Sequence, residues 1–334
     1  MAIVQEEQVC VNSAYQLSVI DGCLQLHCKD ALPETMIVCD LARAKRDYPK
    51  LVPATAAQHG LFIYLPDHLQ LEEAVWMKFT ASSPVQIHCV IVLGKHAKLQ
   101  CVQDWTASTT QAVFDIQLAE HAELQQVKLQ DVDASAQNIA EYTVTQSAHS
   151  HFTNQIFSLG GAESRETWQI IMQGEYARCA LQGLVIANST QRMDQQLIIE
   201  HAAPHCSSDQ QFKAIAADKA IANFSGKVIV RKTGTSAVAH QHSQNLLLST
   251  QAAIGTRPEL EVYTDEVKAS HGATVGQLDA DSLFFLRARG IPLALAQQML
   301  LSAFVATQID NLAPDVRERV APAVTAKLLA VKQL

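Results

Sequence analysis

Histidine is the residue type in this sequence with the widest chemical range, because imidazole can bind a metal ion or move a proton near neutral pH. The chain contains 13 histidines. His149 and His151 are two residues apart, and so are His240 and His242. Alternate residues of a β-strand point to the same side, so each pair would share one face of a strand.

His240 and His242 also stand in a pattern that is similar to the start of the cupin metal-binding motif. Five residues separate Gly234 from His240, and His242 follows after one more. The cupin motif continues with a glutamate four or five residues later, where this sequence has Leu246 and Leu247. A cupin-like metal-binding enzyme that uses His240 and His242 is therefore kept only as the alternative function.

A second candidate cluster is formed by His201, His205 and Cys206, which would share one side of a helix. Pro204 lies between them and makes a continuous helix unfavourable, because proline removes a backbone donor and clashes with the preceding turn. The simpler interpretation is a turn with hydrogen-bonded histidines.

Several common catalytic motifs do not occur in the sequence. Ser225-Gly226-Lys227 is followed by Val228 and has no glycine-rich approach, so a P-loop is excluded. The chain also has no GxSxG elbow, HExxH pair or GxGxxG fingerprint. We therefore do not expect this chain to bind nucleotide through a P-loop or to act through these catalytic motifs.

His271 has different surroundings from the other histidines. It lies in the segment 267–276, VKASHGATVG, where small residues on both sides permit close approach of another backbone or of a ligand. From the residues alone, a histidine in a turn and a ligand histidine both remain open.

The composition limits the classes of partner. The 334 residues include 25 Lys and Arg against 33 Asp and Glu, giving a net charge of -8. No dense run of basic residues occurs, so we expect neither nucleic acid nor a membrane as partner. Apolar residues make up 48% of the chain and charged residues 17%, which is typical of a packed core under a sheet-rich, weakly charged surface.

The eight cysteines include no CxxC pair, which argues against zinc-finger, ferredoxin-type and thioredoxin-type sites. The N-terminal residues MAIVQEEQVCVN lack the basic and long apolar regions of a signal peptide. We therefore expect reduced thiols and a cytoplasmic location.

Three regions differ in the elements that they predict. Residues 1–84 form a mixed N-terminal region with short apolar runs and turn signals. Residues 85–278 contain recurring short strand-like runs with small-residue turns, and the segment 96–102 (HAKLQCV) is echoed 25 residues later at 121–127 (HAELQQV). A strand-turn unit that recurs at this interval is typical of a β-solenoid, and an antiparallel sandwich or barrel is the alternative.

The region 279–334 changes to helical periodicity. Asp279 is a predicted N-cap, Gly290 ends that helix, and Pro292 and Pro314 begin two more. Apolar residues recur every four positions in the last helix, at Val316, Val320, Val324 and Leu328. Pro322 is expected to kink or split this helix. The region therefore predicts a C-terminal helical domain.

The C-terminal half of the sequence resembles a known family. The run 256–279, TRPELEVYTDEVKASHGATVGQLD, followed by LFFLRARGI at 283–291, resembles the C-terminal signature of the SufB/SufD family. Five upstream segments are similar to the SufD side of that family: IVCDL (37–41), GLFIYLP (60–66), HAAPHC (201–206), FSGKV (224–228) and NLLLS (245–249). No SufB-like cysteine cluster is present, and the N-terminal helical region of longer relatives is largely missing, so SufD is favoured over SufB.

The resemblance implies a non-catalytic scaffold subunit of the SUF iron–sulfur cluster assembly complex. It implies a mainly β fold, a right-handed parallel β-helix with a short N-terminal region and a C-terminal helical domain. SufB would pair with the β-helix, and the ATPase SufC would bind the C-terminal helices and hydrolyse ATP. Unpaired β-helix edges also favour a homodimer when the chain is alone.

The resemblance also implies site residues. His271 matches a SufD histidine at the SufB–SufD interface, where a transient iron–sulfur cluster is thought to form, and it would be a metal ligand shared with SufB. Ala269 departs from the pattern, since many relatives have cysteine there. We expect Phe284, Arg287 and Arg289 to face SufC. Relatives are associated with reduced flavin in the whole complex, but no residue here identifies its site, and no cofactor is expected in the isolated chain.

Overall fold

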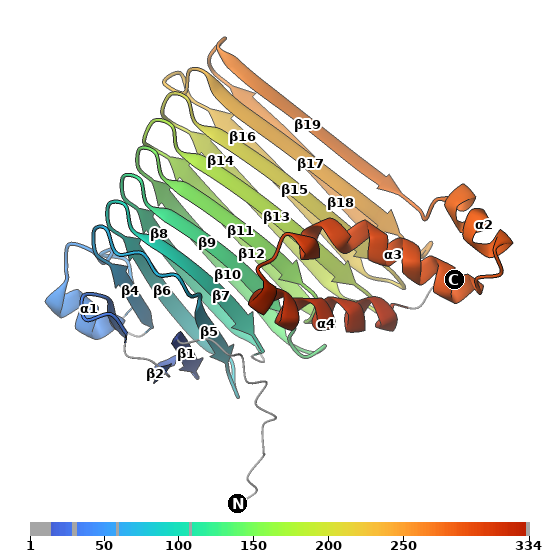
Figure 1. Ribbon diagram of the computed structural model, residues 1–334, viewed down its shortest axis with the longest axis horizontal. Helices are drawn as coiled ribbons and strands as arrows, with labels where there is room; N and C mark the ends of the chain where they lie inside the picture. The colour runs from blue at the N-terminus through green and yellow to red at the C-terminus, as the bar shows by residue number, and fades with distance from the viewer. Residues whose placement is uncertain (1–14, 29–31, 58–59, 107–108, 332–334) are drawn as a thin grey trace, which may run out of the picture.

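The computed structural model describes residues 15–28, 32–57, 60–106 and 109–331. They form a β-solenoid of about seven turns with helices at its C-terminal side (Figure 1). The parallel β-helix and C-terminal helices that the sequence predicts are thereby confirmed. Residues 1–14, with Cys10 and the segment expected not to be a signal peptide, lie outside the described residues.

Two sheets run along the solenoid, and each turn of chain adds one strand to each sheet. The first sheet has ten strands: β1 (Tyr15–Ile20), β2 (Cys23–Cys28), β5 (Val75–Thr80), β7 (Lys98–Trp105), β9 (Glu123–Gln130), β11 (His151–Ser158), β13 (Arg178–Ala187), β15 (Ser207–Ala216), β17 (Ala237–Leu247) and β19 (Val267–Gly276). The second has nine: β3 (Ile37–Asp40), β4 (Leu61–Leu65), β6 (Val85–Leu93), β8 (Thr110–Leu118), β10 (Gln137–Gln146), β12 (Glu163–Met172), β14 (Arg192–His201), β16 (Ile221–Val230) and β18 (Ala253–Val262).

The echo in the sequence corresponds to one turn of the solenoid. Strand β7 pairs in parallel with β9, and Leu99 lies beside Leu124, the residue 25 positions later. Both side chains are fully buried in the space between the sheets. Because alternate residues face this interior, each strand contributes every second side chain to one continuous core.

The parallel pairing begins before residue 85. Strand β4 pairs in parallel with β6, and β5 pairs in parallel with β7. The ladder therefore crosses the expected boundary between the N-terminal region and the β-helix core. The division of the chain into domains at residues 84 and 278 stays a prediction.

The two ends of the solenoid differ. At the N-terminal end, β2 pairs antiparallel with β1, and β3 pairs antiparallel with β4. Helix α1 (Leu41–Asp47), capped by Asp40, packs beside β3 and β4 and buries Leu41 and Ala44. At the other end, β18 and β19 are the last strands of their sheets, so each has one unpaired edge. Among the described residues, the N-terminal end thus finishes in each sheet with an antiparallel strand, whereas the C-terminal end finishes with the parallel strands β18 and β19.

The C-terminal region contains three helices, α2 (Ala280–Ala288), α3 (Leu293–Asp310) and α4 (Pro314–Ala330). Asp279 caps α2, because its carboxylate accepts the backbone N–H of Ser282 at 2.7 Å, and Gly290 follows that helix with a left-handed φ of 82°. Both helix-end predictions are confirmed. The predicted apolar stripe of α4, from Val316 to Leu328, is buried.

Pro322 lies inside α4 without splitting it, so of the two expected effects, a kink or a split, the split does not occur. Tertiary contacts explain why the helix stays continuous at the proline. Val316 and Val320 precede the proline and Val324 and Leu328 follow it, and all four pack into the same apolar cluster. Packing on both sides of the proline holds the helix together.

Helices α3 and α4 lie across the outer face of the first sheet, whereas α2 extends beyond it (Figure 1). Apolar residues of the sheet, among them Leu129 and Leu184, pack against the helices. Polar contacts fix the arrangement: Arg319 on α4 forms a two-bond ion pair with Asp104 at 2.9 and 3.0 Å. The helices are therefore anchored to the solenoid, and α2 is left accessible.

Candidate functional site

The open end of the solenoid presents His271. This residue lies on β19 directly beside Gln241 of β17. Gln241 is buried between the sheets, and neighbouring residues in a parallel ladder point to the same side, so His271 faces the interior. Its side chain is nevertheless exposed, because no further turn covers β19. An interior-facing imidazole is thus accessible from outside the chain.

Ala269 lies on the same side of β19, two residues before His271, beside the buried Ala239. Its small side chain leaves the surroundings of His271 open on that side. The inward positions opposite, on β18, include Pro258 and Leu260, which pair with the inward residues of β16. The open end is therefore mostly apolar around a single imidazole.

His240 and His242 lie on the outer face of β17 and are exposed. They share one face, as their spacing predicts. His240 Nδ1 is 2.8 Å from Ser270 Oγ. In the described part of the chain, no group of three or more His, Cys, Asp or Glu residues could hold a metal ion. The parallel solenoid also differs from the antiparallel barrel of a cupin, so the cupin alternative is wrong.

His149 and His151 do not share a strand face. His149 lies in the turn before β11 with a left-handed φ of 56°, and only His151 is in the strand. The His149 ring instead stacks between His121, at 4.7 Å between centroids, and Tyr176, at 5.1 Å. His68, His96 and His205 extend this stack through equivalent turns. The sequence indicates this stack through histidines that recur at the same turn position, such as His96 and His121.

The segment with His201, His205 and Cys206 contains a turn, as expected. His201 ends β14, His205 has a left-handed φ of 59°, and Cys206 Sγ donates to the carbonyl oxygen of Gly174 at 3.3 Å. These side chains therefore do not form the helical metal cluster that their spacing alone would allow.

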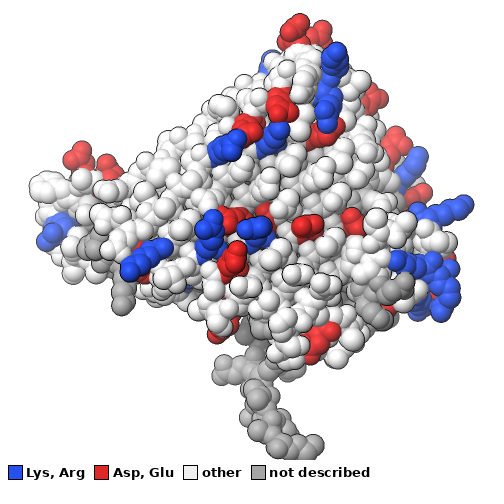
Figure 2. Space-filling model, turned by 180° about the vertical axis from the view of Figure 1, so that it is seen from behind, with Lys and Arg blue, Asp and Glu red and all other residues white. Residues whose placement is uncertain are grey.

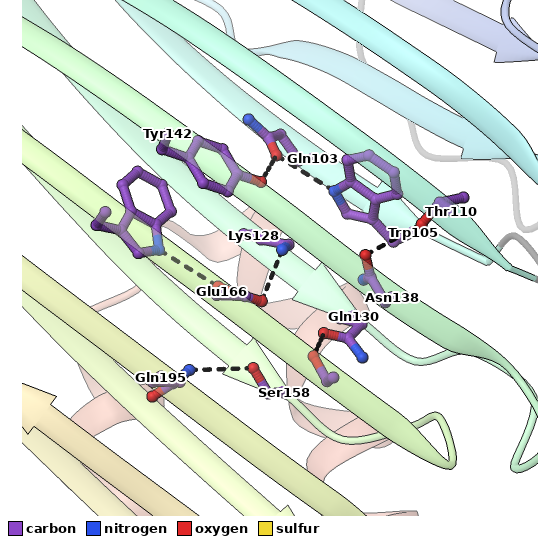
Figure 3. Close-up of polar contacts among 12 residues, drawn as sticks. Gln103, Trp105, Thr110, Lys128, Gln130, Asn138, Tyr142, Ser158, Glu166 and Gln195 are labelled. Carbon is purple, nitrogen blue, oxygen red and sulfur yellow. Dashed lines mark hydrogen bonds and ion pairs between the residues drawn. The ribbon is translucent and has the colours of Figure 1, made fainter.

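Sequence reasoning missed a buried ion pair between the sheets (Figure 3). Lys128 Nζ lies 2.6 Å from Glu166 Oε1, and both side chains are at most 1% exposed. The second carboxylate oxygen of Glu166 accepts the indole N–H of Trp168 at 3.3 Å. Burial lowers the pKa of Lys128, while Glu166 acts in the opposite direction. The two charges compensate one another in an interior that otherwise holds uncharged side chains at this level, both apolar and amide.

Aromatic rings surround this ammonium group. Lys128 Nζ lies 5.5 Å from the ring centre of Trp105 and 5.3 Å from that of Tyr142. Trp105 Nε1 and Tyr142 Oη both donate to Gln103 Oε1, at 3.2 and 3.0 Å (Figure 3). The main role of Lys128, Glu166 and the rings around them is structural, because these side chains are fully enclosed and lie several turns away from the open end.

We expect stability to fall between about pH 6.5 and pH 4 because of His201. This fully buried imidazole has its pKa lowered to about 4, chiefly by burial, and its Nε2 is 2.8 Å from Ser208 Oγ. Below the unfolded pKa of about 6.5, the unfolded chain binds a proton that the folded chain excludes, so acid favours unfolding.

The His201 contribution amounts to roughly 2–3 kcal/mol at pH 4.5 relative to pH 7.5. Urea unfolding of the wild type and of His201→Gln at both pH values isolates it, because the other titrating groups are shared. The difference between the two proteins should change by that amount in favour of His201→Gln at pH 4.5. A constant difference would contradict the prediction.

A second accessible surface lies on α2 and the start of α3. Every residue of α2 is at least partly exposed, and Phe284 is 74% exposed. Exposed apolar side chains continue on α3 at Leu295 and Met299. A cluster of large apolar side chains open to water is typical of a protein-binding surface.

The predicted residue Arg287 lies on the same helix as Phe284, Arg289 follows that helix as its C-cap, and both arginines are exposed. The Arg289 guanidinium lies 3.3 Å from the centre of the Phe285 ring. A positive charge therefore lies beside this apolar surface. The structure thus places Phe284, Arg287 and Arg289 on one short helix and its C-cap. Helix α2 follows β19, the strand of His271, in the chain and projects away from the solenoid (Figure 1).

The charges on the opposite side of the molecule are mixed in sign. Figure 2 shows basic and acidic residues side by side on that face, separated by uncharged surface. Ion pairs link neighbouring turns, for example Arg231 with Glu200 at 2.7 Å and Lys227 with Glu261 at 2.6 Å. Within the described residues, no helix is long and apolar enough to span a membrane.

The family model and the relatives that this chain matches belong to one assembly system. Residues 78–304 match the family model described as SUF system FeS cluster assembly, SufBD core domain. The chain is 34% identical over 203 residues to the iron–sulfur cluster assembly protein SufD of Escherichia coli, covering 61% of this chain and 48% of the relative.

Two other relatives have names from the same assembly system. An iron–sulfur cluster assembly SufBD family protein of Synechocystis is 30% identical over 268 residues, or 75% of this chain and 59% of the relative. SufD of Bacillus subtilis is 25% identical over 283 residues, or 80% of this chain and 64% of the relative. The chain thus spans about half to two thirds of the length of these relatives.

Proposed function

We propose, from the premise that this chain belongs to the SufBD family of the SUF iron–sulfur cluster assembly system, that it is a SufD-like, non-catalytic scaffold subunit. The observation that carries the proposal is the C-terminal end of the solenoid, where both sheets finish with parallel strands. There, β18 and β19 have unpaired edges, and His271 faces the uncovered interior.

The partner at this end is SufB. A second β-helix of the same family can continue both sheets, because the unpaired backbone groups of β18 and β19 need partners and a strand edge supplies them. The apolar interior residues at the end, such as Leu260, would be buried at the same time. When SufB is absent, a second copy of this chain can use the same edges, which gives a homodimer.

The cluster is cargo at this interface and is not a resident cofactor. His271 in its neutral form offers one ring nitrogen with a lone pair, and a nascent cluster between the two chains would take it as a ligand shared with SufB. Ala269 supplies no thiol, so further ligands come from the SufB side. Reduced flavin, if it takes part, binds the whole complex.

SufC binds the surface formed by Phe284, Arg287 and Arg289. ATP hydrolysis takes place in SufC, and its dimerisation moves the helical regions that it holds. Because α3 and α4 are anchored to the outer face of the first sheet by contacts such as Arg319 with Asp104, that motion is transmitted to the solenoid and its open end. ATP binding thereby changes access to the interface.

Co-purification with SufB and SufC from the same cell tests the proposal. We expect the wild type, His271→Ala and His242→Ala all to give a complex with ATPase activity. Cluster formation should fall at least tenfold with His271→Ala only, because His242 lies on the outer face of β17. A chain that stays alone and holds stoichiometric iron or zinc would contradict the proposal.

A further inference from the structure

A column of inward-facing residues runs along the first sheet and ends at His271. Its members occupy one register position on successive strands: Cys101, Gln126, Asn154, Leu181, Gln210, Gln241 and His271. Hydrogen bonds connect neighbouring turns, for example from Gln126 Nε2 to Asn154 Oδ1 at 3.4 Å. Leu181 interrupts the column, so its last three members form a separate polar group.

Gln241 is the member directly beneath His271. It is 4% exposed, and its Nε2 donates to Gln210 Oε1 at 3.2 Å. Its Oε1 is buried and has no hydrogen-bond partner among the described residues. An unsatisfied buried carbonyl oxygen is unfavourable, so its presence at this position needs a reason.

The opposite sheet does not supply a partner for this amide. Gly226 lies across the interior from Gln210. A methyl group on Gly226 would be 3.2 Å from Gln210 Oε1, so the two residues face one another closely. The strand neighbour of Gly226 is Pro258, which has no backbone N–H. On its own sheet, the next rung is His271, and adjacent strands lie about 4.8 Å apart. An imidazole N–H of His271 is thus the available donor.

We propose that Gln241 is the positioning residue of His271. In the described arrangement the Gln241 Oε1 has no partner, but the exposed His271 ring can turn about its side-chain torsions so that one ring N–H donates to it. This hydrogen bond fixes the tautomer. The other ring nitrogen is then unprotonated and points out of the open end, where it can bind a metal ion. Gln210 holds the Gln241 amide in the required orientation through the bond to its Nε2. The inference rests on the proposed function of His271 and adds how this imidazole is oriented.

The titratable groups around His271 belong to the outer faces of the strands. They alternate with the inward positions and comprise His240 and His242 on β17, Lys268 on β19, and Arg257, Glu259 and Glu261 on β18. Gln241 is the inward polar residue paired directly with His271; Ser243 and Thr256 are the other inward polar residues of β17 and β18 nearby, and both are uncharged. The effect of changing Gln241 can therefore be separated from effects of the outer charges.

NMR titration of the histidine-labelled full chain tests the inference, with His271→Ala used to assign the resonance. Gln241→Glu places a carboxylate beneath the imidazole and should raise the midpoint of the His271 titration by one pH unit or more, a tenfold gain in proton affinity. Gln244→Glu adds the same charge on the outer side of β17 and should move the midpoint by less than a third of a unit. Equal shifts in both variants would overturn the inference.

Gln241→Leu removes the acceptor without adding charge, and it keeps the test decisive if the carboxylate variant does not fold. We expect the nitrogen shifts of His271 to change from one dominant tautomer to a mixture. An unchanged tautomer would overturn the positioning role.

Cluster formation in the complex separates this inference from the proposed function. A changed tautomer together with reduced cluster formation in Gln241→Leu supports both. A changed tautomer with normal cluster formation supports the positioning role and contradicts the role of His271 in assembly.

Discussion

Replacing Lys128 by methionine should destabilise the folded chain by about 3–5 kcal/mol. The ammonium group and the carboxylate of Glu166 are 2.6 Å apart, and both are buried between the sheets. Methionine fills a similar volume but leaves the Glu166 carboxylate without its counter-charge. The indole N–H of Trp168 remains as its partner and cannot replace a full positive charge.

The double variant Lys128→Met/Glu166→Gln tests whether the loss comes from the uncompensated charge. Glutamine keeps an oxygen that can accept the Trp168 N–H but has no charge, so most of the stability should return, to within about 1–2 kcal/mol of the wild type. Urea unfolding followed by circular dichroism gives the three free energies. If the double variant is as unstable as Lys128→Met, lost packing would be the cause instead.

Replacing Phe284 by alanine should weaken binding of SufC, the partner that we propose for α2, by about 2 kcal/mol or more, which is roughly 30-fold. Phe284 is 74% exposed, so truncation removes few contacts within the chain, and thermal stability should stay unchanged. An exposed aromatic side chain that becomes buried in an interface contributes through its large apolar area.

Leu329 on α4 provides a matched control, because it is another large apolar side chain with 62% exposure. Leu329→Ala should bind SufC within twofold of the wild type in isothermal titration calorimetry. Arg287→Ala should reduce affinity less than Phe284→Ala and mainly at low salt, since exposed charges are screened. An equal loss for Leu329→Ala and Phe284→Ala would indicate that α2 is not the specific contact.

Local signals in the sequence predict several elements correctly. Asp279 and Gly290 delimit α2 because an N-cap carboxylate and a left-handed glycine act within one turn of helix. The echo between residues 96–102 and 121–127 predicts the solenoid because each turn repeats the same environment. His271 was identified through a resemblance, since its surroundings in the sequence left a turn histidine open.

Other features depend on contacts that no local pattern reveals. Lys128 and Glu166 are 38 residues apart and come from different sheets. His149 has strand-like spacing to His151 but lies in a turn, where stacking on His121 and Tyr176 offsets the strain of its left-handed backbone.

The repeating strand-turn unit, the capped C-terminal helices and the family all follow from patterns in the amino-acid sequence. Which residues come into contact depends on the tertiary fold. Turns of the solenoid differ in length, so Cys101 lies beside Gln126 after 25 residues, whereas Gln210 lies beside Gln241 after 31. Without a constant period, the inward side of each strand and the stacking of Gln241 under His271 follow only from the register of the sheets. The open end likewise follows from pairing, because an edge is defined by the strand that is missing beside it.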